Sequence, residues 1–176
     1  KNYTKTIKSQ PVTLVIGVSG GVDSALTSTL CAHTGLNTIA ISMPIKQNSS
    51  QHDLSLRHLD YLKKNYDNVD CKIIELDNIF KTFEITMRDF DSELAFANSR
   101  SRLRMVTLYQ VAQSNNGIVV GTGNKVEDFG VGFYTKYGDG GVDISPIADC
   151  TKSEVWDLAA EIGVIKEIID AAPTDG

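Results

Sequence analysis

The stretch LVIGVSGGVDSAL, residues 14–26, joins an apolar run to a polar turn that is rich in glycine. The β-branched run over 12–18 shows no alternation, which predicts a strand covered on both faces, as in a parallel sheet. Apolar residues then return at helical spacing, so a helix is expected over 25–35 with Gly35 as its stop. The turn SGGVDS (19–24) therefore lies between a buried strand and a helix.

Strands and helices are predicted to alternate along the rest of the chain. The expected strands span 37–43, 71–76 and 117–122, and the expected helices span 52–66, 79–90, 101–113, 151–163 and 164–172. This alternation predicts right-handed βαβ units, and hence an α/β fold with a doubly wound, mostly parallel sheet and helices on both faces. The segment 123–150 breaks the rhythm, and its aromatic residues argue against disorder, so we expect a functional loop there.

The composition narrows the class of protein. A chain of 176 residues predicts one domain. Its net charge of −5 disfavours nucleic acid as a partner, because proteins bound to DNA or RNA usually present a basic face. No apolar run approaches a membrane span, and the polar start predicts no secretory signal. The three cysteines are odd in number and lack a Cys-x-x-Cys pair, which favours inert buried thiols in a cytoplasmic protein.

The SGGVDS turn has the chemistry of a phosphate site. In doubly wound sheets, ligands lie beyond the carboxyl ends of the strands, and a following helix offers unpaired N–H groups to an anion. The hydroxyls of Ser19 and Ser24 add donors, whereas Asp23 would repel phosphate unless it holds Mg²⁺. The pattern is neither a Walker A loop nor G-x-G-x-x-G. The alternative is a plain glycine-rich turn with Ser and Asp as N-caps.

A second polar loop follows the last predicted strand, which ends at Gly121-Thr122. Because that strand ends at the same edge of the sheet, Glu127 is expected near Asp23 and could complete a Mg²⁺ site. Taken alone, a glutamate such as Glu127 is more commonly a solvated surface residue.

The run FYTKYGDGGVD (133–143) offers further ligand groups. Its aromatics can stack on a base or a pyridine ring, Lys136 can meet phosphate or carboxylate, and Asp143 can accept from ribose hydroxyls. Asp139 could receive a proton. The alternative is a β-turn with a solvated salt bridge.

The SGGVDS turn resembles the pyrophosphate loop of the N-type ATP pyrophosphatases, a superfamily that includes NAD, GMP, asparagine and argininosuccinate synthetases and tRNA-thiolating enzymes. The run over 133–143 is similar to the FTKFGDGG signature of the ammonia-dependent NAD synthetase family. Other matches follow in order: Asn98 with Arg102-Leu103-Arg104-Met105, where Ser101 stands in place of alanine, then Gly121-Thr122 with Glu127, Thr151-Lys152, and Pro173-Thr174.

The resemblance implies an adenine nucleotide alpha hydrolase-like fold, with 1–176 as a single ATP-pyrophosphatase and NAD synthetase domain. It implies a ligase that forms a C–N bond: ATP-dependent amidation of deamido-NAD (nicotinic acid adenine dinucleotide) to NAD with ammonia. The reaction would pass through an adenylated carboxylate and release AMP and pyrophosphate. It also implies a homodimer with deamido-NAD at the interface. Because family chains usually continue further, we expect this one to lack a C-terminal tail.

The resemblance also assigns roles by position. ATP is assigned to Gly17, Val18, Ser19, Gly20, Gly21, Val22, Asp23, Ser24, Thr122, Lys152 and Thr174, and Mg²⁺ to Asp23 and Glu127. Deamido-NAD is assigned to Arg102, Lys136 and Asp143. The catalytic assignments are Asp139, which would deprotonate the incoming ammonium, and Lys152, which would stabilise charge on the leaving pyrophosphate. Gln47 is a candidate for the adenine pocket.

Other functions remain open. GMP synthetase and related amidotransferase subunits share SGGVDS but not YTKYGDGG, and a non-catalytic nucleotide-binding module of the universal-stress type needs no metal pair. A tRNA thiolase is the least favoured, given the acidic charge. The histidines at 33, 52 and 58 match no family position and are expected on the surface or in helices. The apolar residues of the helix over 101–113 fit either a partner or the core.

Overall fold

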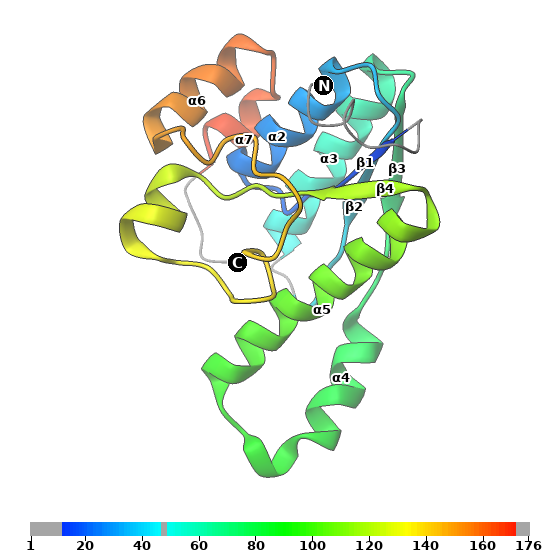
Figure 1. Ribbon diagram of the computed structural model, residues 1–176, viewed down its shortest axis with the longest axis vertical. Helices are drawn as coiled ribbons and strands as arrows, with labels where there is room; N and C mark the ends of the chain where they lie inside the picture. The colour runs from blue at the N-terminus through cyan, green and yellow to red at the C-terminus, as the bar shows by residue number, and fades with distance from the viewer. Residues whose placement is uncertain (1–11, 47–48, 172–176) are drawn as a thin grey trace.

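A parallel sheet of four strands lies at the centre of the computed structural model, which describes residues 12–46 and 49–171 (Figure 1). The strands are β1 (Thr13–Gly17), β2 (Thr38–Ser42), β3 (Val69–Ile73) and β4 (Gly117–Val120), in the order β3-β2-β1-β4. All three pairings are parallel. The chain runs outward from β1 to β3 and then returns to β4 on the other side of β1, so a topological switch point lies between β1 and β4.

Helices and short helical turns connect the strands. They are α2 (Val22–His33), α3 (Ser49–Asn65), α4 (Asp77–Thr86), the 3₁₀ turn η1 (Arg88–Phe90), α5 (Glu93–Ser114), the π-helical turn η2 (Val126–Val131), α6 (Lys152–Glu161) and α7 (Lys166–Ile169). Figure 1 shows α4 and the first half of α5 extending beyond the sheet as a helical hairpin.

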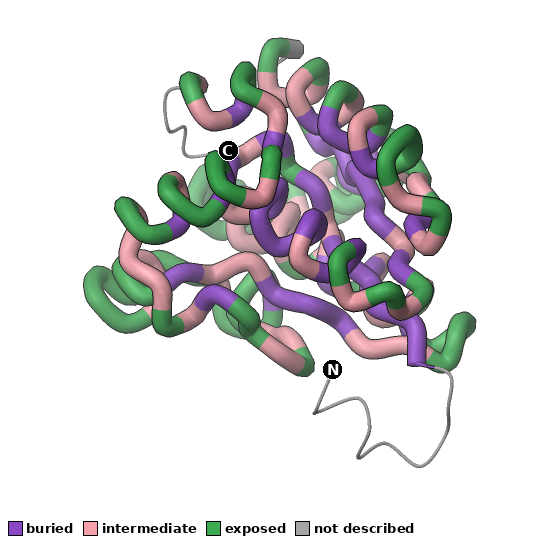
Figure 2. The backbone as a smooth tube through the Cα atoms, turned by 90° about the horizontal axis from the view of Figure 1, so that it is seen from above, coloured by how far each residue is buried: buried purple, intermediate pink, exposed green. Residues whose placement is uncertain are grey.

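Strand β1 is buried on both faces, as its unalternating sequence predicts. Leu14 and Ile16 belong to a core cluster with Leu62 of α3, whereas Val15 belongs to a cluster with Leu108 of α5. Helices therefore cover both faces of the sheet, and the predicted doubly wound α/β fold is confirmed. Figure 2 shows the buried residues concentrated in the strands and on the inward sides of the helices.

Helices α6 and α7 pack against α2 rather than against the sheet. Val155 of α6 and Ile168 of α7 are almost wholly buried in a third cluster, which contains Val22 and Leu26 of α2. The start of α6 is fixed by a capping box between Thr151 and Glu154. This packing brings the first residue of α6 close to the turn that precedes α2.

Several predicted boundaries are wrong. The third strand was expected over 71–76 but spans Val69–Ile73, because its register is set by pairing with β2. Helix α5 begins at Glu93 rather than 101, because its first turns carry too few buried apolar residues to show a period. The helix expected over 79–90 is α4 followed by η1, and the last helix is confined to Lys166–Ile169.

The segment after β4 forms backbone contacts along the edge of that strand which does not pair with β1. Ile144 forms a parallel bridge with Val120, and the backbone N–H of Gly121 donates to the carbonyl of Ile144 at 2.8 Å. A Cβ added at Gly121 would lie 2.6 Å from a methyl group of Val142, so only glycine allows this close approach. The loop after β4 is thereby folded back toward the loop after β1.

Candidate active site

The SGGVDS turn links β1 to α2 and is held by its own hydroxyl groups. The hydroxyls of Ser19 and Ser24 are 3.1 Å apart, and Ser24 Oγ donates to the carbonyl of Gly21 at 3.0 Å. Gly21 is the N-cap of α2 and forms no side-chain cap, so the alternative in which Ser or Asp caps this helix is wrong. The first turn of α2 thus presents its N–H groups and its positive dipole end at the carboxyl edge of the sheet.

Gly20 fixes the shape of this turn. Its φ is +97°, and a Cβ there would lie 2.5 Å from the backbone carbonyl oxygen of Gln51 in α3. Glycine is therefore required both by the backbone conformation and by the close approach of α3.

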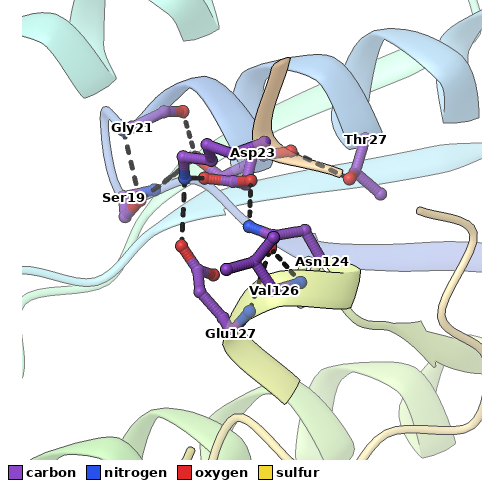
Figure 3. A network of polar contacts seen from close by, with 9 residues as sticks. Ser19, Gly21, Asp23, Thr27, Asn124, Val126 and Glu127 are labelled. Atoms are coloured by element: carbon purple, nitrogen blue, oxygen red, sulfur yellow. Dashed lines mark hydrogen bonds and ion pairs between the residues drawn. The ribbon is translucent and has the colours of Figure 1, made fainter. Parts of the chain in front are cut away.

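Asp23 and Glu127 converge on the ammonium group of Lys152. Lys152 Nζ lies 2.5 Å from Asp23 Oδ2 and 3.0 Å from Glu127 Oε1. The side chains are partly sheltered, with 17% of Asp23, 25% of Lys152 and 37% of Glu127 exposed. Figure 3 shows Asp23 and Glu127 approaching each other from α2 and η2. The two candidate metal ligands are thus neighbours, separated by a cation.

Lys152 is charged in this arrangement. Partial burial acts to lower the pKa of its ammonium, but the hydrogen bonds that it donates to Asp23 and Glu127 and the charges of these acids outweigh burial, so its pKa is raised. The capping box places Lys152 at the first position of α6, within reach of both acids.

Asn124 holds this pair of acids and was not identified from the sequence. Its side chain is completely buried, and Nδ2 donates to Asp23 Oδ1 at 2.8 Å. Its Oδ1 accepts from the backbone N–H groups of Val126 and Glu127 at 3.0 and 3.1 Å. In the sequence, Asn124 is marked only as a polar residue that directly follows GTG (121–123) at the end of a predicted strand. An ordinary loop asparagine would look the same.

Asp128 is a second residue that the sequence analysis missed. Its pKa is raised by burial and then by the charges of Asp139, Glu127 and Asp23. A Cβ at Gly123 would lie 2.5 Å or less from both carboxylate oxygens of Asp128, so a glycine makes room for this group. Acids of both groups of candidate residues, Asp23 and Glu127 on the one hand and Asp139 on the other, therefore act electrostatically on Asp128.

Asp139 is held against α5 by Ser101, which stands where the family pattern has alanine. Ser101 Oγ donates to Asp139 Oδ1 at 2.6 Å and accepts from the backbone N–H of Asp139 at 3.0 Å. The backbone N–H of Thr135 also donates to Asp139 Oδ1 at 3.0 Å. The serine hydroxyl thus forms contacts that an alanine could not form.

The other candidates for the dinucleotide lie along α5. Arg102 Nε donates to the carbonyl of Lys136 at 3.0 Å, and the Lys136 ammonium lies 5.0 Å from the ring centroid of Tyr137. Asp143 accepts from the backbone N–H of Val119 at 2.8 Å and from the Tyr109 hydroxyl at 3.3 Å. Asp143 therefore also anchors the loop to the edge of β4.

An open hollow of about 610 Å³ lies between α5 and this loop. Its walls include Tyr109, Tyr137 and Val142, which are close to Lys136 and Asp143. On α5 itself, Met105 and Leu108 are buried in the core, whereas 66% of Val106 is exposed. The second half of this helix thus packs mainly into the core, while Val106 there and Leu94 in its first turn are largely exposed.

The predicted residues form two neighbouring groups. The first group consists of the turn over 17–24 together with Lys152 and Glu127. The second group lies on α5 and on the loop over 133–143. Thr122 is half-buried at the end of β4. Gln47 and Thr174 lie outside the described residues.

The donor set at Asp23 and Glu127 suits Mg²⁺ that is partly held by substrate. Within 12–46 and 49–171, no group of three His, Cys, Asp or Glu side chains could hold a metal ion. Two carboxylates are nevertheless what Mg²⁺ commonly takes from a protein when phosphates and water supply the other ligands. The residues present fit a metal that arrives with a nucleotide.

The thiols and imidazoles lie outside this site. The three cysteines are free, and burial raises the pKa of Cys31 to about 12. Cys71 and Cys150 are only half-buried, so the expectation of three buried thiols holds for Cys31 alone. The histidines lie on helices as expected, but His58 is fully buried rather than on the surface.

No helix among the described residues is both long enough and apolar enough to cross a bilayer.

Comparisons with known proteins agree with this geometry. A family model described as NAD synthase matches residues 1–176. The NH(3)-dependent NAD(+) synthetase of Carboxydothermus hydrogenoformans is 36% identical over 98% of this chain and 70% of its own length. That of Archaeoglobus fulgidus is 40% identical over 92% of this chain and 64% of its own length. The chain thus spans about two thirds of the length of these relatives.

Solved structures are similar over the same region. The NMN synthetase from Francisella tularensis has a TM-score of 0.84 and 36% identity, covering 92% of this chain and 66% of that one. The NH3-dependent NAD synthetase from Campylobacter jejuni, in complex with nitrate, also has a TM-score of 0.84, with 34% identity, covering 96% and 70%.

Proposed function

Because this chain belongs to the NAD synthase family, we propose that it is a ligase that amidates deamido-NAD to NAD with ATP and ammonia. The observation that carries the proposal is the convergence of Asp23 and Glu127 on one cation position, beside the glycine turn that precedes α2. A plain glycine-rich turn has no need of such a pair.

The first half of the proposed reaction activates a carboxylate. Ammonia cannot displace oxide from the nicotinate carboxylate, so the oxygen is first converted to a better leaving group, AMP, with release of pyrophosphate. Mg²⁺ held by Asp23 and Glu127 would neutralise charge on the phosphates. The N–H groups of the SGGVDS turn and Lys152 would stabilise the departing pyrophosphate, a form of electrostatic stabilisation that is often the largest catalytic contribution.

Lys152 has two successive partners in this scheme. Without substrate, its ammonium neutralises Asp23 and Glu127. With Mg²⁺ and a triphosphate bound, Asp23 and Glu127 would have another cation to neutralise them, and Lys152 would be released to bond phosphate oxygens. The same side chain therefore maintains the charge balance of the empty site and contributes to the filled one.

The second half needs a neutral amine, since ammonium has no lone pair. Asp139 is our candidate to accept the proton, and its carboxylate is held by Ser101 and by the backbone of Thr135. Burial and then the charge of Asp139 raise the pKa of Asp128, so the two carboxyl groups interact electrostatically. General base catalysis of this kind is typically worth about 10²–10⁴-fold.

The remainder of the substrate would lie along α5. The hollow lined by Tyr109, Tyr137 and Val142 has aromatic faces for a pyridine or a base, with Lys136 and Asp143 beside it for phosphate and ribose. Arg102 fixes the backbone at Lys136 and so shapes this wall.

A homodimer is part of the proposal. Apolar side chains are unusually exposed on the helical hairpin and beside the hollow, with exposed fractions of 73% for Phe90 and Leu94, 66% for Val106 and 72% for Tyr137. A second copy covering this surface would complete the wall of the dinucleotide site. A cytoplasmic location accords with the free cysteines.

A second candidate substrate is nicotinate mononucleotide, because a relative of equal structural similarity is described as an NMN synthetase. The carboxylate chemistry would be unchanged, and only the contacts to the distant half of the substrate would differ. The test is an assay of the full-length gene product with ATP, Mg²⁺ and ammonium. Deamido-NAD should give NAD and AMP in equal amounts and should be preferred over nicotinate mononucleotide and XMP. Failure to form AMP with deamido-NAD would overturn the proposal.

A further inference from the structure

We infer that Asn124 is a positioning residue, which fixes the metal-binding orientation of Asp23 and ties it to the start of η2, where Glu127 lies. The inference rests on the proposed function, because it concerns the binding of a metal–ATP complex. Asn124 itself would contact neither the metal nor the nucleotide.

The hydrogen bonds of Asn124 point to this role. Its Nδ2 donates to Asp23 Oδ1 at 2.8 Å, while the other oxygen of that carboxylate, Oδ2, is bonded to Lys152. When Lys152 turns to phosphate, Oδ2 becomes available, whereas Oδ1 remains bonded to Asn124. The amide would therefore leave Oδ2 as the oxygen of Asp23 that is available to a metal.

Asn124 also connects two segments that are far apart in the sequence. Its Oδ1 accepts from the backbone N–H groups of Val126 and Glu127, which gives it the geometry of an N-cap for the turn that carries Glu127 (Figure 3). One buried side chain thus holds a ligand on α2 and the backbone of a ligand on η2. Only an amide of this length supplies a donor and acceptors together.

Comparable hydrogen-bond partners of metal ligands typically change metal affinity by about 10–100-fold when they are removed. We expect a loss of that size here. An N-cap alone would not produce it, because capping requires only the acceptor oxygen, and serine supplies this as well as asparagine.

The variants separate the two roles of the side chain. Asn124→Ser retains an acceptor for the cap but has no group that reaches Asp23, whereas Asn124→Ala loses both. The matched control is Asn68→Ala, because Asn68 Nδ2 donates to the carbonyls of Ala32 and Leu36 at 3.0 and 2.8 Å. These bonds lie at the opposite end of α2 from Asp23, so the control loses stability without touching the site.

The experiment measures binding of Mn²⁺ together with α,β-methylene ATP, which cannot be cleaved between those phosphates, by calorimetry and by thermal unfolding. We expect the dissociation constant to rise about 10–100-fold in both Asn124 variants. The midpoint of unfolding should fall clearly in Asn124→Ala and Asn68→Ala but little in Asn124→Ser. Asn68→Ala should bind like the wild type.

Wild-type affinity in Asn124→Ser would overturn the inference and leave the proposed function standing. Failure of the wild type to bind Mn²⁺ with the analogue would instead overturn the proposed function. If Asn124→Ser is partly unfolded, the Mg²⁺ concentration at half-maximal rate of the full-length gene product replaces calorimetry, since unfolded molecules lower the rate without shifting that concentration. An unchanged value would also overturn the inference.

Discussion

Asp23 Oδ2 and Glu127 Oε1 lie on either side of a single ammonium nitrogen, at 2.5 and 3.0 Å. One acid follows β1 and the other follows β4, and these strands are neighbours only because the sheet order reverses between them. The pair is therefore a product of the topology, and its position beside the glycine turn is what gives the fold its proposed chemistry.

Replacing Asp23 by Asn should abolish turnover while leaving the fold intact. The amide keeps the shape of the side chain but removes the charge that would hold Mg²⁺, so we expect the rate to fall about 100-fold or more, exceeding the effect of a residue that only supports a ligand. The measurement is AMP formation by the full-length gene product. Asp53→Asn, in an exposed pair with Arg57 on α3, is the matched control. Retained activity in Asp23→Asn would contradict the assignment.

Replacing Lys152 by Met should raise the affinity for metal in the absence of nucleotide but lower the catalytic rate. Removing the ammonium leaves the Asp23 and Glu127 charges unbalanced, so Mn²⁺ added without nucleotide should bind more tightly than to the wild type, while the rate with ATP falls. Titration of Mn²⁺ by electron paramagnetic resonance measures the first effect. Weaker binding of Mn²⁺ alone would show that the ammonium does not occupy the cation position.

Replacing Gly20 by Ala should destroy nucleotide binding. At φ +97° a Cβ costs about 1–2 kcal/mol in backbone strain. It would also meet the Gln51 carbonyl oxygen at 2.5 Å and push α3 away from the turn. Gly35→Ala is the matched control, since φ there is +71° but nothing lies within 4 Å of the added Cβ. Calorimetry with ATP and Mg²⁺ should show binding in the control alone, and equal binding in the two variants would refute this account of the turn.

Stability should fall as the pH is lowered from about 6.5 to 4, because the unfolded chain takes up a proton at His58 that the folded protein excludes. Burial lowers its pKa to about 4 from 6.5, so the unfolded chain binds the proton more readily than the folded one. Neutral His58 therefore contributes fully to the free energy of unfolding above about pH 6.5. This contribution, up to about 3 kcal/mol, is lost as the pH is lowered. In urea unfolding between about pH 6.5 and 4, the free energy of unfolding of His58→Leu should change less steeply with pH than that of the wild type.

The sequence predicts the framework of this protein well. The unalternating strand, the SGGVDS turn and the helix after it lie where the pattern places them, because burial on both faces and glycine geometry leave clear marks on the sequence. The expected proximity of Asp23 and Glu127 follows from parallel topology alone and is confirmed by their shared contact with Lys152.

The features that could not be predicted from the sequence were missed for a common reason. Asn124 and Asp128 act through contacts with segments that are distant in the sequence, and neither occupies a position that spacing or periodicity marks. Ser101 stands where the family pattern has alanine, and nothing in its spacing indicates that its hydroxyl donates to Asp139. The first turns of α5 escaped prediction because they project beyond the sheet and bury little apolar surface.

The most direct test of the central claim follows one oxygen atom. Deamido-NAD labelled with ¹⁸O in its carboxylate is supplied with ATP, Mg²⁺ and ammonium to the full-length gene product, and the AMP formed is analysed by mass spectrometry. Attack of the carboxylate on the α-phosphate predicts one ¹⁸O atom in each AMP, formed together with NAD. AMP without the label would mean that water cleaves the nucleotide and that no adenylated carboxylate forms at this site.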